Sequence, residues 1–219
     1  MTASAASTSP PSGVVEALDA ARAALICEID TLNRQIEPLL AALPATLELL
    51  AANPGRLVIS GIGKSGHIGA KIAATLASTG TLSFFVHSTE ALHGDAGMVA
   101  PGDVVLLISN SGRTAEVLRF ADVLKHRGIA MIAVTKDPSS PLARAADVVI
   151  PLAVEREADP LDLAPTASTT ATVAIGDALA AALMQLRHFS REQFAVFHVS
   201  GSLGSALDAD QLVAGGDDD

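Results

Sequence analysis

One segment near the start of the chain combines glycine, lysine and serine in a pattern suited to holding an anion. GIGKSG (residues 61–66) follows the short apolar run LVI (residues 57–59) and precedes small and apolar residues at helical spacing. A strand, a glycine loop and a helix in this order direct backbone N–H groups and a helix N-terminus at an anion. Lys64 adds a positive charge and Ser65 a hydroxyl donor. The pattern is typical of a phosphate-binding loop, and also of a tight turn with a solvated lysine, and this segment alone leaves both open.

Two further segments carry hydroxyl groups where a strand gives way to a helix. SNSG (residues 109–112) follows an apolar run, and Thr114 opens the next helical pattern. Another hydroxyl-rich segment, TASTT (residues 166–170), begins a long alanine-rich helical pattern. Such residues cap helices, but capping explains one or two of them rather than a cluster, so we favour phosphate binding. The expected binding residues are Gly63, Ser65, Ser109, Asn110, Ser111, Thr114, Thr166 and Ser168.

Both nucleotide-binding patterns that GIGKSG resembles lack a required part. The spacing fits G-x-G-x-x-G, but a dinucleotide site needs an acidic residue at the end of the second strand. That strand ends in FVHS, and Glu90 comes too late. A Walker A loop would need glycine at position 58, which is Val58. Neither a dinucleotide nor a nucleoside triphosphate is therefore the expected ligand.

Two carboxylates and two histidines are the candidates for acid–base chemistry. Glu116 and Glu157 follow the third and fifth predicted strands, where a carboxylate can act as a general base. His93 lies after the second strand and His198 lies beyond the sheet, and histidine titrates near neutral pH. Taken singly, such glutamates are more often solvated surface charges, and a lone late histidine is more often structural.

Strand and helix patterns alternate along the chain, which predicts a parallel sheet with helices on both faces and ligands at the carboxyl ends of the strands. A helical pattern over residues 14–52 should break or kink at Pro38 and Pro44. The predicted strands cover residues 57–59, 82–86, 104–108, 129–134 and 148–152. The remaining predicted helices cover residues 68–78, 114–127, 166–186 and 189–197.

Composition limits the classes of protein to which the chain can belong. It has 219 residues, enough for one large α/β domain, and a net charge of −10, which argues against a nucleic-acid partner. The single Cys27 cannot form an internal disulfide, which fits a reducing compartment. We expect no membrane span and no secretory signal. We also expect a disordered N-terminal tail at residues 1–13 and an acidic C-terminal tail at residues 208–219.

Four segments, taken together and in order, resemble the SIS-domain arabinose-5-phosphate isomerases of bacteria. They are GIGKSGHIGAKIAATLASTG, HSTEALHGDAGMV, SNSGRTAE and DLAPTASTTATVAIGDALA. The resemblance covers a domain at residues 14–207. It implies a three-layer, flavodoxin-like α/β/α sandwich with a five-stranded parallel sheet. It also implies interconversion of D-ribulose 5-phosphate and D-arabinose 5-phosphate for the Kdo of lipopolysaccharide or capsule.

The resemblance also implies roles for individual residues. Lys64, Glu116, Glu157 and His198 match the family's proposed active-site positions, and His93 matches a further histidine at the site. No cofactor and no required metal are implied, although an inhibitory transition metal could contact His93. The implied assembly is a cytoplasmic homotetramer with sites shared between subunits.

This chain departs from the family pattern in two places. The family reads H-P-G-G at its last histidine, where this chain has HVSG (residues 198–201). Most members continue into two CBS domains, so we expect a short form or an isolated catalytic domain. Two alternatives stay open: a non-catalytic module that senses a phosphosugar, and an isomerase for a different phosphosugar.

Overall fold

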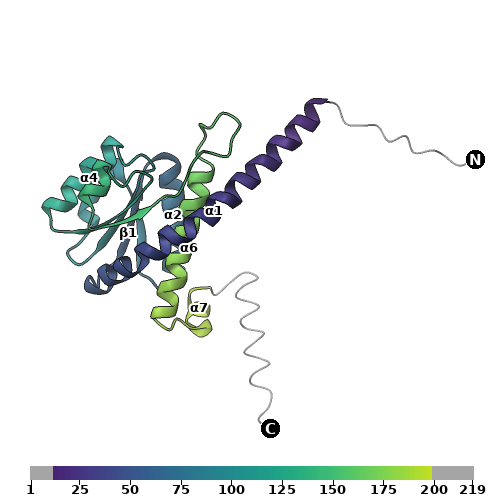
Figure 1. The fold of residues 1–219 in the computed structure, drawn as a ribbon. Coiled ribbons are helices and arrows are strands. Elements are labelled where there is room, and N and C mark those ends of the chain that lie inside the picture. The colour runs from purple at the N-terminus through teal and green to yellow at the C-terminus, as the bar shows by residue number, and fades with distance from the viewer. Residues whose placement is uncertain (1–11, 199–219) are drawn as a thin grey trace, which may run out of the picture.

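A computed structural model describes residues 12–198, which form a five-stranded parallel sheet between two layers of helices (Figure 1). The strand order is β2-β1-β3-β4-β5, and every neighbouring pair is parallel. This confirms the expected fold class. The strands are β1 Leu57–Gly61, β2 Ser83–His87, β3 Val104–Ile108, β4 Ala130–Thr135 and β5 Val148–Pro151. Residues 1–11 of the expected N-terminal tail, the end of the expected domain and the expected C-terminal tail lie outside the described residues, while Ser12 and Gly13 already belong to the first helix.

Two helical layers cover the two faces of the sheet. One layer holds α1, α2 and α6, and the other holds α3, α4 and α5. The helices are α1 Ser12–Ala52, α2 Gly63–Ser78, α3 Ser88–Ala91, the 3-10 helix η1 Asp95–Met98, α4 Ala115–His126, α5 Pro141–Ala145, α6 Ala167–Leu186 and α7 Arg191–Phe197. The short elements α3, η1 and α5 were not expected from the sequence, because each has too few residues to show a period.

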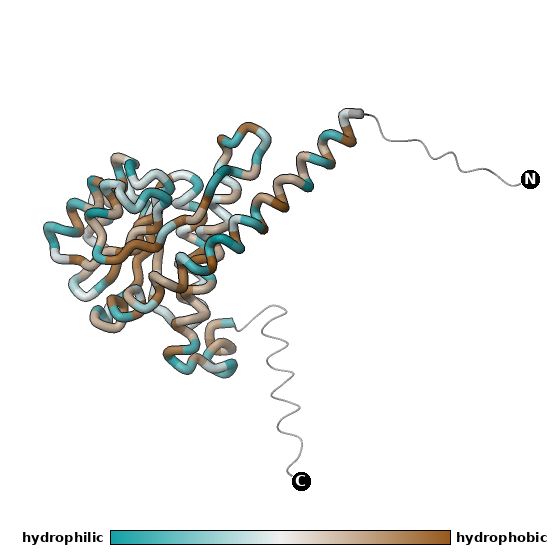
Figure 2. Tube along the Cα trace, in the orientation of Figure 1, coloured by the Kyte–Doolittle hydropathy of each residue, from teal (hydrophilic) through white to brown (hydrophobic). Residues whose placement is uncertain are grey.

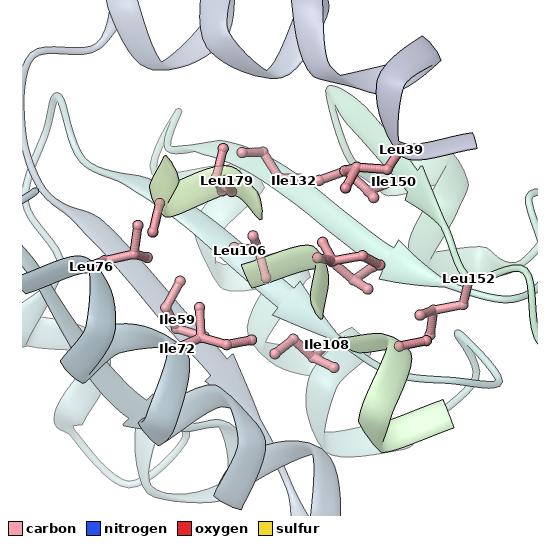
Figure 3. Packing of buried hydrophobic residues seen from close by; sticks show 14 of the residues in the cluster. Leu39, Ile59, Ile72, Leu76, Leu106, Ile108, Ile132, Ile150, Leu152 and Leu179 are labelled. Carbon is pink, nitrogen blue, oxygen red and sulfur yellow. The ribbon is translucent and has the colours of Figure 1, made fainter. Parts of the chain in front are cut away.

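Aliphatic side chains fill the space between the sheet and the helices. Every residue of β1 and β3 is buried, because helices cover both faces of these central strands. Figure 3 shows Ile59, Leu106, Ile132 and other strand residues meeting Ile72 of α2 and Leu179 of α6. The core holds the strands in fixed register, and their carboxyl ends therefore form one edge.

The expected break of the first helix and the expected start of the second were wrong. α1 runs without interruption through Pro38 and Pro44. A proline removes one backbone donor and bends the axis, but the carboxyl half of α1 packs on α6 and β5, and this packing keeps the chain helical. α2 begins at Gly63 rather than at residue 68, so Lys64 and Ser65 belong to its first turn.

The amino-terminal half of α1 projects from the domain, with apolar residues along its length (Figures 1 and 2). Its exposed apolar side chains include Val14, Leu18, Leu25 and Ile29, of which Leu25 is 64% exposed. By length and composition, α1 and α6 within the described residues are both apolar enough to cross a membrane, which the sequence analysis did not anticipate. Half of the apolar stretch of α6 is buried inside the domain, as in a core helix, whereas only 17% of the apolar stretch of α1 is buried.

Candidate active site

The order of the strands creates a crevice at the carboxyl edge of the sheet. β1 lies between β2 and β3, so the chain leaves β1 and β3 in opposite directions and the loops separate. Ligands of open α/β sheets bind at such a point. A pocket of about 60 Å³, the small lobe, lies there. Its lining residues are Ser65, Ile68, Ile108, Asn110, Leu152, Pro165, Ser168, Thr169 and Thr172.

A larger pocket of about 360 Å³, the wide lobe, continues the crevice toward β4 and β5. It shares Asn110 and Pro165 with the small lobe. Its lining residues are Asn110, Lys136, Val154, Glu155, Arg156, Glu157, Asp162, Leu163 and Pro165. The structure thus brings Ser65, Asn110, Ser168 and Glu157 to one crevice, as the sequence analysis expected of strand-end residues.

Lys136 and Arg156 are cations of the wide lobe that the sequence analysis missed. Lys136 follows β4 directly, and its Nζ donates to the backbone oxygen of Glu155 at 3.1 Å. The position of Lys136 was predictable, since β4 ends at the same edge of the sheet as the strands that precede Ser65 and Asn110. Arg156 stands in a loop, and its position relative to the crevice depends on how that loop folds back.

Two helices start beside the crevice with backbone N–H groups that no side chain caps. The N-cap of α2 is Ile62 and that of α4 is Thr114, and neither makes a side-chain capping bond. Gly63 has φ +56°, which favours glycine, and Lys64 is exposed in the first turn. Gly66 serves packing instead, because a Cβ there would lie 3.2 Å from the backbone oxygen of Gly61. Uncapped helix N-termini attract anions.

The loop between β3 and α4 uses one of its hydroxyl groups internally. Ser109 is buried, its Oγ lies 2.9 Å from Oγ1 of Thr114, and it accepts from the N–H of Gly112 at 3.2 Å. Ser111 is exposed and accepts from the N–H of Arg113 at 3.2 Å. Ser109 therefore shapes the loop, while Ser111 presents a hydroxyl at its surface. Ser109, Ser111 and Thr114 line neither lobe.

Asn110 carries the one polar side-chain oxygen of the crevice that is buried without a partner in the described part of the chain. Its backbone is fixed, because the N–H of Lys136 donates to its carbonyl oxygen at 2.9 Å. A buried acceptor without a donor costs free energy. Since Asn110 lines both lobes, a ligand hydroxyl in the crevice could supply the missing donor.

The anion at the N-terminus of α6 is the protein's own carboxylate. Oε2 of Glu157 accepts from the backbone N–H of Thr166 at 2.8 Å and of Ser168 at 3.1 Å. Oγ1 of Thr166 accepts from the N–H of Ala158 at 2.7 Å. We expected Thr166 and Ser168 to bind the substrate at an anion-binding start of α6. This expectation is corrected for their backbone N–H groups, because both already donate to Glu157. The side chains of Ser168 and Thr169 still line the small lobe.

The carboxylate of Asp159 is held by backbone N–H groups of its own loop. Burial would raise the pKa of the Asp159 carboxyl, but the N–H groups of Leu161, Leu163 and Ala164 donate to it and together hold the pKa below its usual value. Those three hydrogen bonds measure 3.0, 2.9 and 2.9 Å. Asp159 is therefore ionised, and its carboxylate fixes the backbone of residues 161–164.

Three of the expected acid–base residues line neither lobe. Glu116 stands half-buried in the first turn of α4, at the edge that carries the crevice. His93 is exposed between α3 and η1. His198 follows α7, with its ring stacked on Phe194 at 3.8 Å between centroids. Among the described residues, no group of three or more His, Cys, Asp or Glu could hold a metal ion.

The position of His198 follows from the length of α6. That helix starts at the crevice and has 20 residues, so its far end lies roughly 30 Å away. There Arg187 donates to the backbone oxygen of Gly80 and to Oγ1 of Thr81, just before β2. α7 and His198 follow this end, at the amino edge of the sheet, so His198 does not reach the crevice of its own chain.

Comparison with known proteins identifies the family. Residues 49–182 match the family model described as SIS domain. The chain belongs to the SIS domain family. Arabinose 5-phosphate isomerase KdsD of Pseudomonas aeruginosa is 57% identical over 160 residues, which are 73% of this chain and 49% of that protein. Arabinose 5-phosphate isomerase GutQ of Salmonella typhi is 49% identical over 190 residues, 87% of this chain and 59% of that protein.

A solved structure is also similar to this SIS domain. The E. coli CFT073 protein c3406, in complex with A5P, superimposes with a TM-score of 0.80 and 42% identity, covering 87% of this chain and all of that chain. This chain spans about half the length of the curated relatives that it matches. Every residue that lines the two lobes lies within the matched SIS segment, and His198 lies beyond it.

Proposed function

We propose that this SIS domain is an aldose–ketose isomerase that interconverts D-ribulose 5-phosphate and D-arabinose 5-phosphate. The observation that carries the proposal is the state of Glu157, which lines the wide lobe. Its Oε2 is held by two backbone N–H groups, while its Oε1 has no hydrogen-bond partner in the described part of the chain. A carboxylate with one anchored and one open oxygen suits proton abstraction from carbon. The relatives named arabinose 5-phosphate isomerase support this substrate.

The phosphate of the substrate binds at the uncapped start of α2, beside the small lobe. Backbone N–H groups there have no competing side-chain cap, and Ser65 supplies a hydroxyl inside the lobe. Lys64 in the first turn of α2 and Ser111 on the neighbouring loop add a charge and a donor. The sugar chain then extends past Asn110 into the wide lobe, where Oδ1 of Asn110 accepts from a sugar hydroxyl.

The isomerisation moves one proton between two carbons and one between two oxygens. The base removes a proton from C1 of the open-chain ketose, and the electron pair forms the enediolate with negative charge on O2. A proton passes from O1 to O2, the base returns its proton to C2, and an aldehyde results at C1. Glu157 is the base in this scheme and Glu116 the alternative. Lys136 and Arg156 stabilise the enediolate electrostatically. The reaction is redox-neutral overall, so no redox cofactor is part of the scheme.

The proposed assembly is a cytoplasmic homotetramer in which subunits share their sites, with a role in Kdo biosynthesis. Two features support shared sites. His198 lies at the edge of the sheet opposite the crevice of its own chain, so it could serve only the crevice of another copy. The amino-terminal half of α1 exposes a stripe of large apolar side chains, and burying such a stripe against another copy is favourable.

The decisive experiment measures deuterium uptake from heavy water into a panel of pentose and hexose phosphates, beside direct binding. The wild type should interconvert D-ribulose 5-phosphate and D-arabinose 5-phosphate with exchange at the reacting carbon. Glu157→Gln should lose turnover by about 10²–10⁴-fold and bind substrate almost unchanged. Glu48→Gln, on the exposed face of α1, is the matched control and should behave as the wild type.

Three results would change the proposal. If Glu157→Gln takes up deuterium at the wild-type rate while Glu116→Gln loses deuterium uptake, Glu116 is the base. Turnover of another phosphosugar in preference to the pentose phosphates would replace the substrate. Binding of phosphosugars by a wild type that shows neither exchange nor interconversion would leave the sensory module as the function.

A further inference from the structure

The loop that carries Glu157 is anchored in the core by Leu152, Val154 and Ala158, but beyond Ala158 it is held by carboxylates rather than by apolar packing. It spans residues 152–166 between β5 and α6 and stands out from the domain beside α1 (Figure 1). The two large apolar side chains beyond Ala158, Leu161 and Leu163, are 74% and 76% exposed. Asp159 instead gathers three backbone N–H groups of the loop. A base on such a loop needs specific hydrogen bonds to keep its position.

Asp162 makes a hydrogen bond to the main chain of the proposed base. Its Oδ1 accepts from the backbone N–H of Glu157 at 2.6 Å. Asp162 has φ +55°, in the left-handed region that aspartate and asparagine tolerate better than most other residues. This backbone conformation costs free energy. The same residue therefore combines an unfavourable conformation with a bond to the main chain of Glu157.

The two ends of Glu157 are fixed by different partners. Its backbone N–H donates to Asp162, and its Oε2 accepts from Thr166 and Ser168 at the start of α6. On the other side, Sγ of Cys27 in α1 lies 3.8 Å from the backbone oxygen of Glu157. These contacts leave Oε1 as the open atom of the residue. A carboxylate fixed at the main chain and at one oxygen has few alternative orientations.

We propose that Asp162 is a positioning residue that holds Glu157 in the orientation required for proton abstraction. The inference rests on the proposed function, in which Glu157 is the base. Asp162 lines the wide lobe but acts through the main chain of Glu157 rather than on the substrate. Proton abstraction depends steeply on geometry, and a misplacement of about 1 Å can cost about 100-fold in rate. Substrate affinity depends on it much less.

Three variants distinguish the effect of losing the hydrogen bond to Glu157 from the effect of changing the backbone conformation at Asp162. Asp162→Gly tolerates φ +55° but removes the acceptor, so kcat should fall by roughly 10- to 100-fold with little change in KM. Asp162→Asn keeps an acceptor oxygen and tolerates the same φ, so it should retain most of the turnover. Leu161→Gly adds the same flexibility one residue earlier, at an exposed side chain outside both lobes, and should leave kcat unchanged.

Amide hydrogen exchange supplies a second measurement that does not require turnover. The N–H of Glu157 should exchange roughly tenfold faster in Asp162→Gly than in the wild type, and at the wild-type rate in Asp162→Asn. Unchanged exchange in Asp162→Gly would overturn the inference. So would wild-type kcat in Asp162→Gly when Glu157→Gln is inactive. A wild type without any isomerase activity would instead refute the proposed function, and the exchange experiment would still test the contact.

Discussion

The side chain of Gln35 pairs with Pro151 at the free edge of the sheet. Nε2 of Gln35 donates to the backbone oxygen of Pro151 at 2.8 Å, and its Oε1 accepts from the N–H of Ala153 at 2.8 Å. A side chain of α1 thus makes the two bonds that a further strand would make beyond β5. Gln35 is only 3% exposed. This pairing fixes the point at which the Glu157 loop leaves the sheet.

Replacing Gln35 by leucine should therefore destabilise the domain. The change keeps the side-chain size but leaves one partly buried carbonyl and one partly buried N–H without partners, at a cost of about 1–3 kcal/mol in the free energy of unfolding. Urea denaturation measures the change. Gln185→Leu on the exposed face of α6 is the matched control and should stay within about 0.5 kcal/mol of the wild type. Equal stability of both variants would show that the Gln35 bonds contribute little.

The two serines of the β3–α4 loop should respond differently to alanine. Ser111→Ala removes an exposed hydroxyl, so affinity for a sugar phosphate should fall by about 1.5–3 kcal/mol while stability is unchanged. Ser109→Ala removes a buried hydroxyl that bonds Thr114 and Gly112, so it should cost about 1–2 kcal/mol of stability. Calorimetry and urea denaturation measure the two effects. Unchanged affinity in Ser111→Ala would remove this residue from the proposed cradle.

Much of the fold was predictable because burial on both faces leaves a plain signal. β3 matches its predicted bounds, and β1, β2, β4 and β5 start or end within two residues of theirs. Central strands of a covered parallel sheet are almost continuously apolar. The start of α2 was missed because its first turn contains Gly63 and Gly66, which resemble a loop when tertiary packing is unknown.

Contacts that depend on the folded chain were harder to anticipate. The crevice was predictable from strand ends, which is why Ser65, Asn110 and Glu157 were found. The bond between Glu157 and the start of α6 joins residues nine and eleven positions apart across an irregular loop, where no periodicity applies. Nothing in the sequence singled out Gln35, because only the position of α1 against β5 buries it.

The exposed stripe of α1 predicts a change in assembly when it is made polar. Leu18 and Leu25 lie seven residues apart on one side of the helix and are 61% and 64% exposed. Leu18→Glu with Leu25→Glu should shift the protein to smaller species in light scattering without loss of helix content by circular dichroism. If His198 serves another copy's crevice, turnover should fall with the assembly. A wild type that is monomeric and fully active would contradict shared sites.

The ion pair of Asp103 and Arg56 gives the domain a predicted response to acid. Burial of Asp103 would raise its pKa, but hydrogen bonds from the Arg56 side chain and from the N–H groups of Ala100 and Arg56, with the charge of Arg56, hold the pKa below its usual 3.8. Nη2 of Arg56 lies 2.7 Å from Oδ2 of Asp103, whose side chain is 3% exposed. The ionised carboxylate is therefore favoured in the folded chain.

A carboxyl group with a lowered folded pKa stabilises the protein above its unfolded pKa and loses that contribution as pH falls through its folded pKa. Asp103→Asn should thus cost about 3 kcal/mol near neutral pH, and its deficit relative to the wild type should shrink below pH 3.8. Urea denaturation between about pH 3 and pH 8 measures this difference. Asp177→Asn, which removes the exposed partner of Lys71, is the control and should cost less than about 1 kcal/mol. A deficit for Asp103→Asn that stays constant down to pH 3 would show that the lowered pKa is not the source of the stability.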